Sequence, residues 1–292
     1  FLMLAFLFKN PIIVGMSDAK PHPSRMSMCW KWASVGVLIG LVLLWIFLTP
    51  PGVLGKADAV GYALCHRIEI RSYQIGTRQF PLCVRCTGQF LGALLALIYQ
   101  FFSGRRCMGK PGWGVLAVLG SLFLFYLVDG LNSYLHLTPM MQALPNLPRL
   151  YEPSNLLRLL TGTGIGLVIA AAVYPSFNST VWCNPDPRPA LRTASLAGLL
   201  VSALILDGLI LLQIPWVMLV LAVLSAVAAL TLLAMVYTII VVILLQQENR
   251  FERMSQLVLP LLGGLGIAFL QIAIVDLLRY WLTGTWDGFH LG

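Results

Sequence analysis

The amino-acid sequence predicts an all-α fold, a polytopic membrane helix bundle with about seven transmembrane helices. Composition is the first indication, because 59% of the 292 residues are hydrophobic and only 10% are charged, whereas about 25% of residues are charged in a soluble globular domain. A chain of this length with so few charges cannot cover itself with a solvated surface. The second indication is a series of seven long apolar runs, each bounded by charges, proline or glycine. We therefore expect lipid to be the solvent for most of the chain.

Each apolar run has the length of a transmembrane helix, since a span needs roughly 20 apolar residues. The bilayer core offers no water to backbone N–H and C=O groups, so each run is expected to be helical. Prolines mark three of the boundaries: Pro50-Pro51 ends the first run, Pro175 ends the fourth, and Pro215 separates the fifth from the sixth. The runs lie at 31–49, 83–102, 113–137, 155–174, 190–213, 216–245 and 254–282.

The runs divide the chain into three parts. An amino-terminal tail covers 1–30, and its residues 1–15 read as an extension upstream of a start at Met16. A four-helix membrane region covers 31–175 and contains a cysteine-bearing polar loop at 50–86, and three further transmembrane helices cover 176–292. Small residues recur at helical spacing within the runs, as in Gly88 with Gly92 and Gly162 with Gly166, and this spacing favours close packing of helix backbones.

The basic residues indicate an orientation. The net charge is +8, and assigning alternate loops to the two sides places 11 of the 19 Lys and Arg on the side of the amino terminus and 8 on the other. The positive-inside rule then places the amino terminus in the cytoplasm and the cysteine loop on the outer side of a bacterial inner membrane. Nucleic acid is excluded as a partner because no soluble domain is present to carry a basic patch.

Seven polar or charged residues are predicted to lie in the half of the membrane that faces the cysteine loop. Odd-numbered helices end on the side where even-numbered helices begin, so these residues share one level. Each buried charge costs about 2.5–3.5 kcal/mol on insertion scales, so such residues usually pair or line a wet cavity. Both a structural network of ion pairs and a functional cavity remain open. The seven residues are Arg85, Asp129, Asn155, Arg158, Asp207, Asp276 and Arg279.

The loop before the second run carries four candidate metal ligands. Cys83 and Cys86 form a C-x-x-C pair, and Cys65 and His66 precede Cys83 by 18 and 17 residues. Two thiolates on one turn suit a tetrahedral ion such as zinc, and Cys65 with His66 would complete the set. Adjacent residues rarely both reach one ion, so water or an acidic residue is the other choice for the fourth ligand. A disulfide from Cys65 and a redox-active pair are the two alternatives.

The same loop resembles a known family. The run C-H-x-x-x-x-R-S, from Cys65, followed by G-x-R-Q-x-P-L-C-x-R-C-T-G, from Gly76, is similar to the prokaryotic membrane proteins called domain of unknown function 2085. The resemblance covers roughly residues 60–170 and implies a membrane protein without an assigned biochemical role. The positions that it carries over are Cys65, His66, Arg71, Ser72, Cys83, Arg85, Cys86, Asp129, Asn155, Arg158 and Gly162.

Three functions remain open at this point. The first is a non-catalytic accessory subunit that packs against a larger respiratory or photosynthetic membrane complex. The abundant small-residue helix faces and the small extramembrane mass favour this role. The second is a membrane enzyme or redox protein that uses the cysteine loop on a lipid-soluble substrate such as a quinone. The third is a small-solute transporter, although charges confined to one half of the membrane fit a midplane transport site poorly. Whether the chain is an enzyme is left undecided.

Overall fold

The computed structural model describes residues 28–137, 140, 146 and 148–288. The interpretation of residues 1–15 falls outside these residues. Within these residues six helices are long and apolar enough to cross a membrane, which confirms the all-α bundle. They are α4 (Val84–Ser103), α5 (Trp113–Leu135), α7 (Asn155–Val181), α8 (Thr193–Leu211), α9 (Pro215–Leu244) and α10 (Met254–Thr283).

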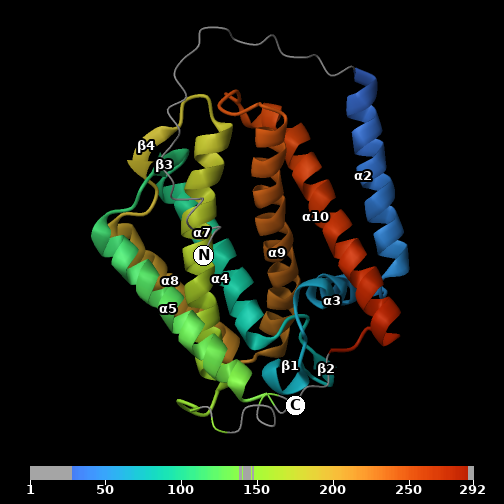
Figure 1. The fold of residues 1–292 in the computed structure, drawn as a ribbon, viewed down its shortest axis with the longest axis vertical. Coiled ribbons are helices and arrows are strands. Elements are labelled where there is room, and N and C mark those ends of the chain that lie inside the picture. The colour runs from blue at the N-terminus through green and yellow to red at the C-terminus, as the bar shows by residue number, and fades with distance from the viewer. Residues whose placement is uncertain (1–27, 138–139, 141–145, 147, 289–292) are drawn as a thin grey trace.

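A bent pair of helices is the candidate for the seventh expected span. Helix α2 (Met28–Leu48) runs beside α10 (Figure 1), and α3 (Gly52–Leu64) follows after a bend of 104°. The bend coincides with Pro50-Pro51, because a proline lacks the amide proton that would continue the helix. Counting this pair as one span brings the total to seven.

Two of the expected boundaries were wrong. Residues 50–86 are not loop throughout, because α3 occupies Gly52–Leu64 and buries most of its residues against α9 and α10. Its short length and its polar Lys56 and Asp58 concealed it in a search for 20-residue apolar runs. Pro175 does not end the fourth helix, since α7 continues to Val181. Membrane helices tolerate proline where neighbouring groups satisfy the freed carbonyl, so the division at 175 falls inside a helix.

Helices α4 and α7 form the centre of the bundle and approach backbone to backbone. A methyl group added at Gly88 would lie 2.7 Å from the Leu159 carbonyl oxygen, and one at Gly92 would lie 2.7 Å from that of Thr163. On the facing helix, Gly162 lies directly against the backbone of α4. Glycines on both helices therefore create the contact, as small residues do in membrane helix pairs.

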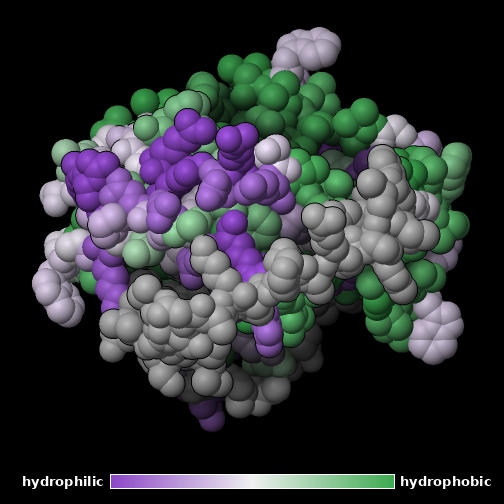
Figure 2. Space-filling model, turned by 90° about the horizontal axis from the view of Figure 1, so that it is seen from above, coloured by the Kyte–Doolittle hydropathy of each residue, from purple (hydrophilic) through white to green (hydrophobic). Residues whose placement is uncertain are grey.

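The two ends of the bundle carry different polar structures (Figure 1). One end is a cap formed by residues 52–83, with α3, a 3-10 turn at Glu69–Arg71, and the antiparallel strands β1 (Gln74–Ile75) and β2 (Arg78–Gln79). At the other end β3 (Cys107–Gly109) pairs in parallel with β4 (Asp186–Pro189). Figure 2 views this second end and shows hydrophilic residues gathered on it, with hydrophobic residues around the sides, as expected for a bundle surrounded by lipid.

Candidate functional site

Three cysteines converge where the cap meets the bundle. The Sγ atoms of Cys65, Cys83 and Cys86 all lie within 4.8 Å of one another, and all three residues are free thiols. Cys65 caps the carboxyl end of α3, Cys83 caps the amino end of α4, and Cys86 lies in the first turn of that helix. The C-x-x-C spacing places two sulfurs on one turn, and the folded-back cap brings the third to them.

Backbone amides point at the sulfur of Cys65. The N–H of Arg67 donates to Cys65 Sγ at 3.4 Å, and the N–H of Cys83 donates to the same atom at 3.3 Å. The neighbouring thiols of Cys65 and Cys86 donate to the Cys83 sulfur, and this lowers the pKa of Cys83 well below the ordinary thiol value. The same hydrogen bond to Cys83 raises the pKa of Cys65 to about 12. Cys83 is therefore the member of the group that carries negative charge most readily.

His66 does not join the three sulfurs. Its side chain is exposed, and the group of described residues able to share one ion contains the three cysteines without it. Consecutive side chains diverge, so burying Cys65 turns His66 toward solvent. The backbone of this stretch is held by Arg279, which donates to the carbonyl oxygens of Tyr62 at 2.5 Å and Cys65 at 2.6 Å. Of the four ligands expected from the sequence, the structure therefore brings the three cysteines together and places His66 apart from them.

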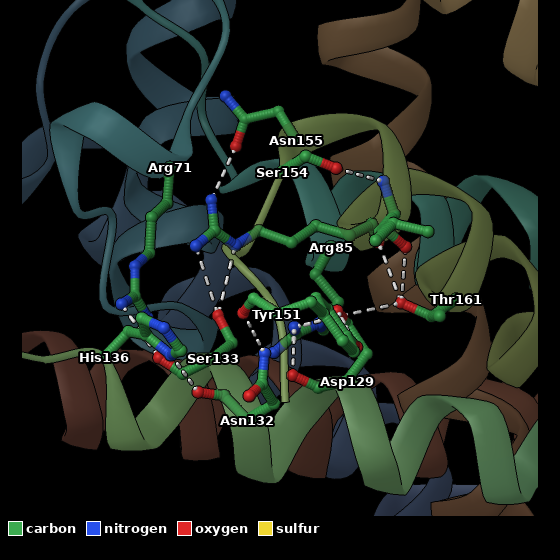
Figure 3. A network of polar contacts seen from close by, with 12 residues as sticks. Arg71, Arg85, Asp129, Asn132, Ser133, His136, Tyr151, Ser154, Asn155 and Thr161 are labelled. Carbon is green, nitrogen blue, oxygen red and sulfur yellow. Dashed lines mark hydrogen bonds and ion pairs between the residues drawn. The ribbon is translucent and has the colours of Figure 1, made fainter. Parts of the chain in front are cut away.

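Asp129, near the end of α5, is the acceptor at the centre of the polar site. Its carboxylate forms an ion pair with Arg85 and accepts hydrogen bonds from Tyr151 Oη at 3.0 Å and Thr161 Oγ1 at 3.1 Å. Figure 3 shows these side chains reaching Asp129 from different segments of the chain. Asp129 is only 2% exposed, so these three side chains, and not water, compensate its negative charge.

Two further arginines meet the last turns of α5. Arg158 donates from Nε and Nη2 to Ser133 Oγ, both at 3.2 Å, and from Nη1 to Asn155 Oδ1 at 2.9 Å. Ser154 caps the amino end of α7 by accepting from the Leu157 amide at 3.2 Å, which fixes the turn that presents Arg158. Arg71, from the cap, donates to the Ser133 carbonyl oxygen at 3.0 Å (Figure 3).

The arginines outnumber the carboxylates at this site. Burial, and next the charge of Arg85, lower the pKa of Arg71, while the nearby Cys83 opposes that change. Arg158 is also within electrostatic range of Arg71, Arg85 and Cys83. Three guanidinium groups therefore face one carboxylate and one acidic thiol, which leaves a positive excess next to the cysteines.

The other charged residues expected in this network lie in separate groups. Asp207, on α8, accepts from Thr163 Oγ1 at 2.6 Å, and Asp276, on α10, accepts from Trp45 Nε1 at 3.0 Å. Arg85 forms an ion pair with Asp129, so two of the seven residues proposed from the sequence meet directly. Hydroxyl and indole groups thus donate to two of the three aspartates, and an arginine pairs with the third.

Several residues that belong to this site or to the cap were not predicted from the sequence. Asn132 and Ser133 follow Asp129 by three and four positions, so helical periodicity places them on the same face of α5 and was a usable signal. Asn132 Oδ1 accepts from the Leu150 amide at 2.9 Å, which positions the segment that carries Tyr151. Asp58 of α3 forms ion pairs with Arg67 and Arg78 inside the cap, and no periodic pattern pointed to those.

A crevice opens from the polar site toward lipid. It has a volume of about 430 Å³ and lies between α5 and α7, with the Asp129, Tyr151 and Thr161 side chains at its polar end and apolar residues along the rest. The Nε atoms of Arg71 and Arg85 are buried and have no hydrogen-bond acceptor among the described residues. The polar site therefore adjoins an opening whose walls are otherwise apolar.

Comparisons with known proteins cover the part of the chain that forms this site. Residues 65–172 match a family model described as predicted membrane protein (DUF2085). An uncharacterized protein of Methanothermobacter thermautotrophicus is 30% identical over 112 residues, which amount to 38% of this chain and 86% of the relative. No solved structure matches the chain. The family match begins at Cys65 and includes the other two cysteines, Asp129 and Arg158.

Proposed function

Since the chain belongs to the DUF2085 family of predicted membrane proteins, we propose that Cys65, Cys83 and Cys86 hold a metal ion and that this centre serves a lipid-soluble substrate. The observation that carries the proposal is the convergence of three sulfurs within 4.8 Å. Zinc–sulfur bonds of about 2.3 Å in tetrahedral geometry place sulfurs about 3.8 Å apart. The three thiols are thus within a small adjustment of a zinc site.

The surroundings favour thiolates over a disulfide. Amide N–H groups aimed at Cys65 Sγ stabilise negative charge on that sulfur, and second-shell donors of this kind orient and tune metal ligands. The positive excess of Arg71, Arg85 and Arg158 over Asp129 is offset in part by the acidic Cys83 thiol, and a bound metal would displace the protons of the other two thiols. A disulfide is neutral and would leave those guanidinium groups without compensation.

Three protein ligands leave one coordination position for water or substrate, as in catalytic zinc sites. Bound zinc supplies Lewis acidity to such a position. The crevice between α5 and α7 gives a lipid-soluble molecule access from the bilayer. Its polar end, at Asp129, Tyr151 and Thr161, would receive the oxygen-bearing head group of such a molecule, for example a quinone. The chain's own contribution is to bind and orient that head group beside the thiolates.

Metal analysis of the detergent-purified protein tests the proposal. We expect about one zinc per chain, and Cys83→Ser should lower the metal content at least about ten-fold because removal of a ligand weakens a three-ligand site. Cys183→Ser, an exposed cysteine outside the cluster, is the matched control and should retain the metal, as should His66→Ala. A native protein that contains no metal, or in which Cys65 is disulfide-bonded to Cys83 or Cys86, would overturn the proposal.

A non-catalytic accessory subunit is the second candidate, favoured by the outward face of α5. That helix exposes large side chains such as Leu124, Phe125 and Leu131, and a neighbouring respiratory or photosynthetic complex would cover them as well as lipid does. Mild solubilisation of native membranes separates the two candidates. Migration of the chain alone on a native gel, while neighbouring complexes stay intact, contradicts the accessory role.

We propose further that the cap faces the outer side of a bacterial inner membrane, with the amino terminus in the cytoplasm. The end with β3 and β4 carries basic residues in short loops, which the positive-inside rule assigns to the cytoplasm. They are Arg105, Arg106, Lys110, Arg188, Arg192, Arg250 and Arg253.

Labelling in intact cells tests this orientation. Cys183 lies at the same end and is exposed, so a membrane-impermeant maleimide should label it only after the cells are opened. Cys183→Ser identifies the labelled position. Equal labelling of Cys183 before and after opening would reverse the orientation.

A further inference from the structure

A second apolar opening lies at the opposite end of the bundle from the cysteines. It is a groove of about 310 Å³, open at the surface, to which α4, α7, α9 and α10 all contribute side chains. Its walls are almost wholly apolar, so within a bilayer the natural occupant is a hydrocarbon chain and not water. Residues that represent the four helices are Leu97, Phe101, Phe177, Met235, Leu257 and Leu261.

Two arginines border this groove just past the end of α4. Arg106 is held in place: its guanidinium carbon lies 4.1 Å from the centre of the Trp182 ring, and its Nη2 donates to the Glu252 carbonyl oxygen at 2.7 Å. Arg105 is exposed and lies 5.8 Å from the centre of the Phe101 ring. Because α4 ends at Ser103, both cations lie at the level expected for lipid head groups.

We propose that this groove is a binding site for an anionic phospholipid, with an acyl chain along the groove and the phosphate at Arg105 and Arg106. The argument is one of complementarity: an apolar channel for the chain meets two positive charges at the membrane surface, where basic pockets between helices attract anionic head groups. The site involves neither the cysteines nor the crevice between α5 and α7, so it is independent of the proposed metal centre.

Native mass spectrometry with defined lipids tests this site. The purified protein is mixed with phosphatidylglycerol or phosphatidylcholine, and retention of each lipid is compared. Phosphatidylglycerol should be retained in preference, and Arg105→Ala with Arg106→Ala should weaken its retention by about 30-fold, as two basic residues at an anionic surface predict. Lys110→Ala removes an exposed charge from the same end without touching the groove and should leave retention unchanged.

A variant that fills the groove distinguishes binding of the acyl chain in the groove from attraction of the head group to surface charge. Leu261→Trp keeps both arginines but occupies the channel, so it should also reduce phosphatidylglycerol retention, with the thermal midpoint recorded to show that the protein is folded. Equal retention of the two lipids by the native protein would overturn the proposal. So would a loss in Lys110→Ala as large as in the double arginine variant, because binding would then follow net charge alone.

Discussion

Replacing Asp129 with alanine should destabilise the folded bundle by about 3–5 kcal/mol, since removal of one member of a buried ion pair leaves the other charge uncompensated. Asp129 is almost fully buried, and its partner Arg85 is itself mostly shielded from solvent. The side chains of Tyr151 and Thr161 lose their acceptor in the same step. Two hydroxyl donors and one guanidinium group are thus affected together.

Unfolding in mild detergent with increasing denaturant measures this effect. Asp186→Ala is the control, because it breaks an exposed ion pair with Arg188, and surface pairs contribute little to stability. Asp129→Asn keeps an oxygen acceptor without the charge, so its midpoint should fall between those of the native protein and Asp129→Ala. If Asp129→Ala unfolds at the same denaturant concentration as Asp186→Ala, the carboxylate does not hold the bundle together.

The pairing of Arg85 with Asp129 illustrates how far the sequence leads. Because helix direction alternates, the start of α4 and the end of α5 lie at one level of the membrane. An isolated charge is costly there, so the charged side chains at these two helix ends are expected to have partners. Which donor each acid selects is a different matter. Asp207 accepts a hydrogen bond from the hydroxyl of Thr163, and Asp276 accepts one from the indole of Trp45. The sequence does not predict these partners, because the rotation of each helix and the identity of its neighbours depend on tertiary packing that hydropathy does not encode.

The fold of the cap could be predicted from the sequence only in part. The spacing of Cys83 and Cys86 predicts that their sulfurs share a turn, but the distance from Cys65 depends on how 17 intervening residues fold. Those residues fold with contacts that no sequence period reveals, such as the ion pairs of Asp58 with Arg67 and Arg78. The sequence therefore predicts the candidate ligands as a group and cannot exclude His66, whose exposure follows from the path of the backbone.

Replacing Gly162 with alanine should separate α4 from α7 and lower stability by at least about 1–3 kcal/mol, the usual range for overpacking. The added methyl group meets the carbonyl oxygen of Arg85 on α4, and a backbone atom cannot rotate away as a side chain would. Relief therefore requires a shift of the helix itself. A control is Gly120→Ala on α5, where a methyl group meets no atom within 4 Å, so helix propensity makes that change neutral or slightly stabilising.

The same variant connects helix packing to the cysteine cluster. Arg85 lies between Cys83 and Cys86 in the sequence, so displacing its backbone moves both sulfurs relative to Cys65, which is carried by α3. Gly162→Ala should consequently lower the metal content as well as the denaturation midpoint, whereas Gly120→Ala should change neither. Metal analysis and unfolding of the two variants in one detergent provide the measurement. A Gly162→Ala protein with native stability and full metal content would show that α4 and α7 have more room than their backbone contact implies.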